Sequence, residues 1–590
     1  MTTMHDINIR ATADERFWGN AYPDSVYLWT SSKNNLTLRE FDASGAGTME
    51  DPFPSKKSVQ EAHDFCRAAY YKYLGILSAK LNEIHGLDVP ETFWRTVFGS
   101  WLYRHVSIVY DKFVSLRRID IDRTSITLLS PGSFYIPYDH FDHIRCFCND
   151  HGVLQLVSQY YTMFATTEFP TASAQCNQEI LRRNWNNPHG NLIVQANGDA
   201  HRPTDPDQSS PDQTVRIALC SAYYPKSILD TLSAASDGMV SDIALPPVAA
   251  NKKELDWRSR ELLAKPHSDD AFERYLDQSL LYCMPQILVE YFNDYYHAYS
   301  RHVEASQHDA IVTECWISFM PVSIYCAIAR HKKNVRLILQ HHGASNQWHY
   351  CNVLWIEKEV ADSYITSGYP GDTANCVVGG FAIREPRRYQ FETWKSDILH
   401  VTTTRFPYLL SCGDYAHGGE RFLRYLRGID ALIDMIPARL KEHYVLRPRR
   451  EELLLDTEHT WDVTRRVARI EGEGDLLPLL LGARLVIIDH MSTGLAELLT
   501  CRIPFVLLYI EEFEFLSEAY AGLFDDLIAC GVVHKSPASL ADHVDRVYDD
   551  VQSWWQSGPV QRAIDQIIGL SLGPPHRTTD YLLSLLQTAK

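Results

Sequence analysis

The sequence lacks any long apolar run. No segment approaches the roughly 20 consecutive apolar residues that a membrane-spanning helix needs. The first residues, MTTMHDINIRATADERFWG, contain no apolar core of the kind found in signal peptides. The 13 cysteines are an odd number and are scattered along the chain, as is typical of reduced thiols in the cytoplasm. We therefore expect a cytoplasmic protein that contacts a membrane at most peripherally, at its inner face.

Basic residues are also few relative to acidic ones. The formal net charge is −18 at pH 7, whereas a protein that binds nucleic acid over a wide surface carries an excess of Lys and Arg. We therefore expect no nucleic-acid partner. A small anionic ligand stays compatible with this charge, because its site needs only local positive potential.

Three common catalytic motifs are missing. The chain contains no G-x-x-x-x-G-K-[ST] phosphate loop, no G-x-S-x-G nucleophile elbow and no H-E-x-x-H zinc-protease motif. These absences disfavour a P-loop kinase, a serine hydrolase of the elbow type and a zinc protease.

Two segments resemble metal sites only superficially. Residues 140–150, HFDHIRCFCND, hold two histidines and two cysteines, but their spacing fits no common structural zinc pattern. Asp120 and Asp122 form an Asp-x-Asp motif, yet alternate residues of a strand share one face, which favours two exposed carboxylates. We therefore predict no metal site.

The length of the chain predicts more than one domain. A chain of 590 residues exceeds what one hydrophobic core supports, and 45% hydrophobic and 22% charged residues are typical of a globular protein. The patterns predict an N-terminal domain over residues 1–384, a C-terminal domain over 397–575 and a tail over 576–590. Within the first domain we expect a mainly helical region over 58–196, a loop over 197–214 and a Rossmann-like region over 215–384.

In both domains short apolar runs alternate with helical segments. AIVTEC, PVSIYCAIARH and VRLILQ predict strand, helix and strand in the first domain. After residue 397 the alternation resumes with ILHVTTT, RFLRYLRGIDALIDMI, HYVLRPR, LLPLLLG, RLVIID, STGLAELLT and PFVLLY. Strands that alternate with helices form parallel sheets. We predict an α/β fold with two Rossmann-like domains that face each other across a cleft, and ligands at the carboxyl ends of the strands.

The first candidate site is the turn QHHG, residues 340–343, at the end of a predicted strand. Gly343 permits backbone conformations that other residues resist. His341 and His342 belong to the residue type best suited to proton transfer near neutral pH. A histidine that only caps a helix or fills the core is the alternative, but the strand, the turn and the loop position together favour a functional role for at least one of the pair.

The second candidate site is DHMSTGLAELL, which begins at Asp489. His490 lies in the turn, and Ser492 and Thr493 begin a short helix that carries Glu497. The N–H groups of a helix start and two hydroxyls suit a phosphate, although plain N-capping explains the same residues equally well.

An arginine cluster follows a further strand. Arg447, at the end of HYVLR, presents a fork that fits phosphate or carboxylate. We interpret the adjacent Arg450 as surface charge.

These segments resemble the transferases encoded in bacterial O-antigen and surface-carbohydrate gene clusters. The resemblance covers most of the chain, and the order and spacing of its segments are more specific than any one of them. The segments are TADERFW, FWRTVFGSWLYRHVSIVYDKF, QHHG, EKEVADSYITSGY, ILHVTTTRFPY, LRPR, DHMSTGLAELLTCRIPFVLLY and DDVQSWWQSGPVQRA. The chain departs from the family at the turn, where relatives have Gln-His-Gly-Gly and His342 takes the place of a glycine.

The resemblance implies a glycosyltransferase of the two-domain GT-B type that uses neither an essential metal nor a cofactor. A nucleotide-activated sugar donor, for which a CMP-linked acidic sugar is one option, would bind the C-terminal domain. A glycan or lipid-linked acceptor would bind the N-terminal domain. The implied donor- or substrate-binding residues are Gln340, Gly343, Arg405, Arg447, His490, Ser492, Thr493 and Glu497.

The reaction itself stays open at this point. An inverting enzyme needs one base, for which His341 and His342 are the candidates. A retaining enzyme would need a carboxylate nucleophile, for which Glu290, Glu314 and Asp139 are the candidates. The alternatives are a CDP-polyol phosphotransferase of the teichoic-acid type and a non-catalytic glycan-binding or assembly protein.

Overall fold

The structure is a computed structural model, and it describes most of the chain. The described residues are 7–18, 25–29, 37–43, 47–175, 215–222, 224–248, 252–314, 316, 319–343, 346–382, 387–391, 396–412, 420–450, 456–467, 469–471 and 474–587. The loop predicted over 197–214 lies outside these residues.

The middle of the chain forms a six-stranded parallel sheet. Its strands are β7 (Ile217–Leu219), β8 (Val240–Asp242), β9 (Ala310–Thr313), β10 (Arg336–Gln340), β11 (Ser363–Thr366) and β12 (Cys376–Val378). Their order is β12-β11-β10-β9-β7-β8, with every neighbouring pair parallel. Apolar runs such as Leu337-Ile338-Leu339 are buried, as in a sheet that helices cover on both faces.

Helices connect these strands. They are α8 (Lys226–Ala235), α9 (Trp257–Ala264), α10 (Ala271–Cys283), α11 (Gln286–Val289), α12 (Phe292–Ala305), α13 (Met320–Lys333) and α14 (Leu354–Val360). Strand β7 lies between β8 and β9, so the strand order changes direction there. Such a switch point leaves a crevice at the carboxyl ends of the strands.

The C-terminal part of the chain forms a second six-stranded parallel sheet. Its strands are β13 (Ser396–Val401), β14 (Tyr444–Arg447), β15 (Arg469–Ile470), β16 (Ala483–Ile488), β17 (Phe505–Leu508) and β18 (Val533–His534). Their order is β15-β14-β13-β16-β17-β18, so this sheet changes direction between β13 and β16. Its helices are α15 (Glu420–Met435), α16 (Thr457–Thr460), α17 (Leu476–Leu481), α18 (Thr493–Cys501), α19 (Ala521–Ala529), α20 (Pro537–Val547), α21 (Val551–Trp555) and α22 (Gly558–Ser571).

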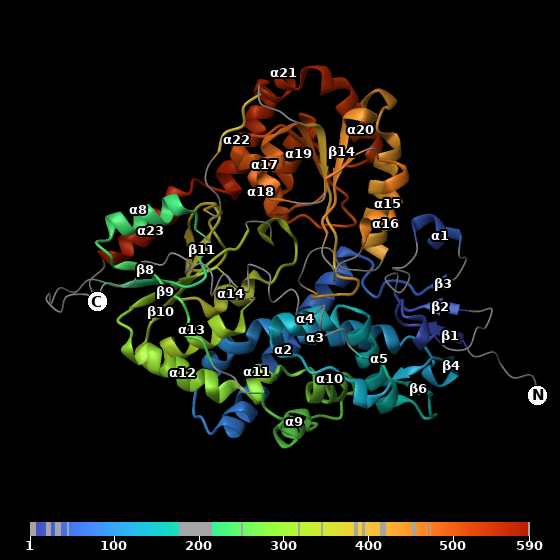
Figure 1. Ribbon diagram of the computed structural model, residues 1–590, viewed down its shortest axis with the longest axis vertical. Coiled ribbons are helices and arrows are strands. Elements are labelled where there is room, and N and C mark those ends of the chain that lie inside the picture. Colours follow the sequence, from blue (N-terminus) through green and yellow to red (C-terminus); the bar gives the residue numbers. More distant parts are fainter. Residues whose placement is uncertain are drawn as a thin grey trace, which may run out of the picture.

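A helical base lies beneath both sheets in Figure 1. It contains α2 (Lys56–His85), α3 (Glu91–Leu116), α4 (His140–Phe147) and α5 (Asp150–Phe164). The Ser55 side chain accepts the Ser58 N–H and begins α2, and Gly86, at φ 63°, ends it. Twenty of the 26 residues of α3 are buried, because this helix packs against α2, α5, α10, α13 and α14.

The first residues form a small parallel sheet of four strands. These are β1 (Ile7–Arg10), β2 (Ser25–Tyr27), β3 (Gly47–Thr48) and β4 (Thr124–Ser125), in the order β3-β2-β1-β4, with α1 (Leu38–Ala43) nearby in sequence. A further pair joins β5 (Leu128–Leu129) and β6 (Thr171–Ala172). Strands of two to four residues are too short to give a periodic signal. The Asp-x-Asp segment is a 3-10 turn, Ile121–Arg123, rather than a strand.

The C-terminal segment returns to the N-terminal domain. Residues 576–590, interpreted from the sequence as a tail, contain the helix α23 (His576–Leu586), which lies beside α8 in Figure 1. Leu582 and Leu585 belong to the same apolar cluster as Ile217, Val312 and Ile338 of the first sheet. The segment is therefore part of the N-terminal core, since its apolar face is buried there.

The two sheet-bearing domains are in direct contact. The Ser517 N–H donates to the Trp348 carbonyl at 2.7 Å, and the Tyr350 N–H donates to the Phe515 carbonyl at 2.8 Å. The predicted α/β fold with two Rossmann-like domains is confirmed. Two such domains in contact through the loops at their carboxyl edges define the GT-B architecture.

Candidate functional site

The carboxyl edges of the two sheets meet at Gly343 and Thr493. Gly343 follows β10 and has a φ of +80°, a left-handed conformation that favours glycine. A Cβ atom at this position would lie 2.6 Å from Oγ1 of Thr493, closer than real Cβ contacts allow. The predicted turn and the predicted helix start therefore face each other across the domain boundary.

The start of α18 is capped by Ser492 and faces the other domain. The Ser492 side chain accepts the Gly494 N–H at 3.2 Å, so Ser492 is an N-cap, as the simpler interpretation predicts. Thr493 is the first helical residue and is partly exposed. Glu497, one turn further along the same side, is buried. The positive end of this helix dipole is thus directed at the turn from β10.

A buried carboxylate, Asp489, positions His490 in the turn before this helix. Asp489 follows β16, and its Oδ1 lies 2.8 Å from Nδ1 of His490 and accepts the Tyr425 hydroxyl at 3.1 Å. Its Oδ2 lies 2.9 Å from Nε2 of His400, on neighbouring β13. Burial alone would raise the pKa of Asp489, but the hydrogen bonds from His400 and His490 hold it below the usual value. The network fixes the His490 ring at the edge of the sheet.

A second acid supports the same turn from the other side. Oε2 of Glu514 accepts the Met491 N–H at 2.7 Å, and its Oε1 lies 3.4 Å from the Arg405 guanidinium. Burial raises the pKa of Glu514 to about 8. Arg405 lies four residues after the end of β13, so the segments after β13, β16 and β17 all contribute to this edge.

Arg447 borders the same edge from β14. The Thr402 N–H donates to the Arg447 carbonyl at 3.1 Å, which places the end of β14 beside the end of β13. The Arg447 guanidinium is half-buried and donates to the Pro448 and Gly474 carbonyls. Arg450, in contrast, pairs with Glu458 at the surface, in line with its interpretation as surface charge.

The two histidines of the turn differ in environment. His341 is 1% exposed, and neither of its ring nitrogens has a hydrogen-bond partner among the described residues. Burial, with a smaller contribution from His342 and Lys358, lowers its pKa to about 3, so the ring is neutral. The His342 side chain is 53% exposed, and its Nδ1 lies 3.9 Å from Oε2 of Glu314. His342 can therefore contact a ligand, whereas the surrounding residues hold the buried His341 ring in one orientation.

Glu314 lies at the switch point of the first sheet. It follows β9, the strand between β7 and β10. Its side chain is fully buried, and within the described part of the chain neither carboxylate oxygen has a hydrogen-bond partner. A buried carboxylate without a partner is costly and calls for a functional explanation.

Gln340, the last residue of β10, is fixed by a buried hydrogen bond. Its Oε1 accepts the hydroxyl hydrogen of Tyr224 at 2.5 Å, and its side chain is buried. This bond fixes the last residue of β10 and thereby the direction in which the turn leaves the sheet.

Glu357 lies close behind the turn, and nothing in the sequence predicts a role for it. Glu357, on α14, is 3% exposed and its Oε2 accepts the Tyr364 hydroxyl at 2.9 Å. Burial raises its pKa to about 7, and the opposing effects of the Tyr364 bond, His342 and Arg104 are smaller. Its segment, IEKEV, reads in sequence as the charged surface of a helix, so no sequence signal marks it.

Glu290 is not brought to the site. The Arg260 guanidinium holds both of its carboxylate oxygens, at 2.7 and 2.8 Å, and the Asp256 N–H donates to the same group. Both side chains of the pair are buried. This arrangement gives Glu290 a structural role and removes it from the candidate catalytic residues. Asp139 has a similar role as the N-cap of α4.

We expect the Glu357→Gln change to flatten the pH dependence of stability. In the unfolded chain this acid ionises near pH 4.5, and in the folded chain near pH 7. Between these values the folded state holds a proton that the unfolded state has released, so the free energy of unfolding falls as the pH rises. The fall amounts to about 3 kcal/mol for one such group.

Urea unfolding at pH values from 5 to 8 measures this slope. The Glu83→Gln change, at an exposed position of α2, is the matched control and should leave the slope unchanged. An equal slope in Glu357→Gln and the unaltered protein would contradict the assigned ionisation of Glu357.

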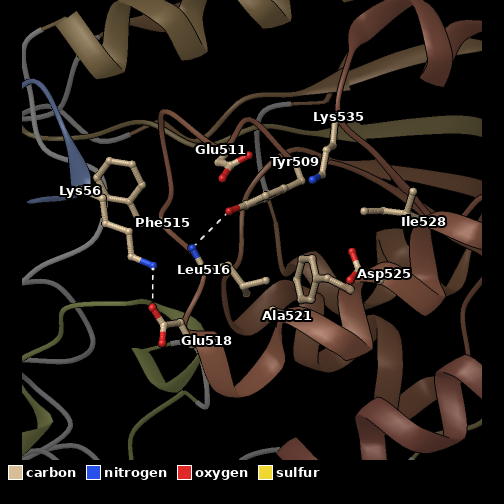
Figure 2. Close-up of a pocket in the computed structure, with 11 residues that line it drawn as sticks. Lys56, Tyr509, Glu511, Phe515, Leu516, Glu518, Ala521, Asp525, Ile528 and Lys535 are labelled. Atoms are coloured by element: carbon tan, nitrogen blue, oxygen red, sulfur yellow. Dashed lines mark hydrogen bonds and ion pairs between the residues drawn. The ribbon is translucent and has the colours of Figure 1, made fainter.

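A pocket of about 180 Å³ lies beside this edge of the C-terminal domain. Figure 2 shows that Tyr509, Glu511, Phe515 and Leu516, which follow β17, form one side of it. Lys56 of α2 reaches across to Glu518 at 3.6 Å. The pocket therefore lies where the helical base meets the C-terminal domain.

No group of three or more His, Cys, Asp or Glu side chains is placed to hold a metal ion in the described part of the chain. In the same ranges, no helix combines the length and the apolar character that crossing a membrane requires.

The fold and the site define a two-domain α/β protein of the GT-B type, with a helix start and a histidine turn opposed across its domain boundary. The model of the LIC12162 family transferases matches residues 8–569. The chain therefore belongs to this family of transferases.

Comparison with solved structures gives distant similarities. MurG from Acinetobacter baumannii is 13% identical with a TM-score of 0.30, over 63% of this chain and 99% of that one. The glycosyltransferase SnogD from Streptomyces nogalater is 11% identical with a TM-score of 0.32, over 63% and 100%. MnaA from S. aureus, in a structure with UDP, is 11% identical with a TM-score of 0.34, over 64% and 99%. No curated protein sequence matches the chain.

Proposed function

We propose that the protein transfers a glycosyl group from a nucleotide-activated sugar to a glycan or lipid-linked acceptor of surface-polysaccharide or O-antigen synthesis. The observation that carries this proposal is the approach of Gly343 to Thr493. It brings a buried imidazole, an accessible imidazole and a helix start to one place between two Rossmann-like domains.

The C-terminal edge has the properties of a donor site. The start of α18 offers a positive dipole end and the Thr493 hydroxyl to a phosphate. Arg447, at the end of β14, and Arg405, in the loop after the neighbouring β13, supply positive charge for the phosphate that leaves. In this proposal Glu497 binds a hydroxyl of the donor, and His490, held by Asp489, contacts its phosphate. No cofactor or metal enters the reaction.

The N-terminal edge has the properties of the acceptor site. The accessible His342 takes the proton of the acceptor hydroxyl, and Glu314 stabilises the imidazolium that forms. The neutral His341 donates one N–H to the leaving phosphate. In an inverting reaction the acceptor oxygen then forms a bond to the anomeric carbon as the bond to the phosphate oxygen breaks. In a retaining reaction Glu314 would be the nucleophile.

A nucleotide-binding assay with a charge variant tests the donor site. Thermal-shift titration with CMP, CDP, UDP, GDP and TDP should raise the melting temperature for at least one nucleotide, because a ligand of the folded state stabilises it. The Arg447→Gln change should weaken that nucleotide about tenfold or more, as expected for a charged hydrogen bond. The Arg439→Gln change removes a surface arginine that pairs with Asp545 and should leave the affinity unchanged.

Turnover is tested with the matching nucleotide sugars. Release of the nucleotide in the presence of acceptor, with a glycosidic product, supports the proposal. A phosphodiester product would show polyol-phosphate transfer instead. The absence of any nucleotide-induced shift would overturn the donor site.

A further inference from the structure

Arg104 is a half-buried arginine that contacts a histidine. It lies on α3, and its NH1 is 3.1 Å from Nε2 of His140, the first residue of α4. Its Nε is buried and has no hydrogen-bond partner in the ranges that the structure describes. Among the residues that the structure describes, none of the acids forms an ion pair with it. Arg260 of the same domain, in contrast, is held by both oxygens of Glu290.

Arg104 lies on the side of the site that we assign to the acceptor. Helix α3 packs against α13 and α14, the helices that follow β9 and β10. Arg104 and His342 both contribute to the electrostatic environment of Glu357 on α14. The guanidinium and the histidine of the turn therefore lie around one buried carboxyl, on the side of the cleft opposite the donor helix α18.

The groups around Arg104 leave its charge uncompensated. His140 and His143, which also feel the charge of Arg104, are held neutral because burial lowers the pKa of both well below the usual value. Burial raises the pKa of Glu357 to about 7, so this acid carries little charge in mildly acidic solution. Glu314 lies against His342.

Lys358 and His105 also lie in this cluster, and neither adds a free positive charge to that of Arg104. Lys358, next to Glu357, already pairs with Asp372, so it adds no free positive charge. His105 contacts His143 at 3.1 Å and is neutral, since burial lowers its pKa to about 3. Arg104 thus remains as the half-buried cation of this cluster.

We propose that Arg104 and His140 form an oxyanion subsite, which binds a carboxylate or phosphate carried by the acceptor. The planar guanidinium fork fits either group, and His140, which accepts from Arg104, fixes the direction of the fork. This inference rests on the proposed function, because it takes the N-terminal domain as the acceptor side. It names the acceptor as an acidic glycan or a sugar phosphate rather than a neutral saccharide.

Binding of small sugar probes tests the subsite directly. The probes are glucuronate, glucose 1-phosphate and glucose, titrated in the presence of a saturating nucleotide that occupies the donor site. We expect glucuronate, glucose 1-phosphate or both to raise the melting temperature, and glucose to have no effect. The arm that responds distinguishes a carboxylate from a phosphate. An equal response to glucose would overturn the proposal.

Two variants of the same helix locate the effect. The Arg104→Gln change should weaken the acidic probe about tenfold or more, as expected when a charged hydrogen bond is lost. The Arg117→Gln change, at the exposed end of α3, should leave its affinity unchanged. Equal affinity in Arg104→Gln and the unaltered protein would overturn the proposal.

Further readouts separate this proposal from the proposed function and from misfolding. The nucleotide shift should persist in Arg104→Gln, because the donor helix is on the other domain. If no nucleotide binds while the acidic probe depends on Arg104, the proposed function fails and the subsite stands. If Arg104→Gln does not fold, the Arg104→Lys change, which keeps the charge but loses the fork, should bind the acidic probe more weakly than the unaltered protein. Unchanged affinity in Arg104→Lys would contradict a fork-shaped site.

Discussion

Replacing His342 by alanine is expected to lower kcat by about 10²- to 10⁴-fold, the contribution typical of a positioned general base. The ring is accessible and lies 3.9 Å from Glu314, so it combines contact with substrate and a carboxylate that stabilises its protonated form. Initial rates at saturating donor and acceptor measure the change. The His297→Ala change, at an exposed position of α12, is the control and should leave kcat unchanged.

The pH dependence of kcat/KM distinguishes the base from its neighbour. In the unaltered protein the rate should fall as acid protonates the base, and His342→Ala should lose this acidic limb. The His341→Gln change should lower the rate but keep the limb, because the buried His341 ring, with a pKa of about 3, is neutral throughout the working range. An acidic limb that persists in His342→Ala and disappears in Glu314→Gln would assign the base to Glu314.

The alternation of strands and helices in both sheets is predictable because their strands are buried apolar runs bounded by turn residues. VRLILQ and RLVIID are β10 and β16. The helix before β10, α13, has a proline in its first turn, and the helix after β16, α18, begins at the Ser492 cap. The small sheet of β1 to β4 is not predictable in this way. Its strands pair residues as distant as Asn8 and Ser125, and strands so short carry no periodicity.

The candidate site separates into local and long-range parts. The turn QHHG and the start of α18 are local features, and their chemistry follows from residue type and position. Their opposition across the domain boundary needed the structure. The same is true of Glu357, whose significance comes from burial, and of Arg104, whose Nε has no partner among the described residues. It is also true of Glu290, whose pairing with Arg260 joins positions 30 residues apart.

Replacing Gly343 by alanine is expected to lower kcat/KM about 100-fold, because it displaces the two halves of the site from each other. A left-handed alanine costs about 1 kcal/mol of stability, and its Cβ would lie 2.6 Å from the Thr493 hydroxyl. The turn must therefore move away from α18, and misplacement by about 1 Å is enough for a loss of this size. The Gly522→Ala change, where a Cβ meets nothing within 4 Å, is the matched control.

A double-mutant cycle with Thr493→Ala decides whether the contact between the domains causes the effect. Thr493→Ala removes the hydroxyl that the new methyl group would meet, so the double variant should be more stable than the sum of the two single changes predicts, by about 0.5 to 3 kcal/mol. The strain of an alanine at φ +80° is present both in Gly343→Ala and in the double variant, so it cancels in the cycle. Urea unfolding of the four proteins measures the coupling. Strict additivity would mean that Gly343 and Thr493 do not meet in solution, and the opposition of the turn and the helix start, on which the proposed transfer depends, would then fail.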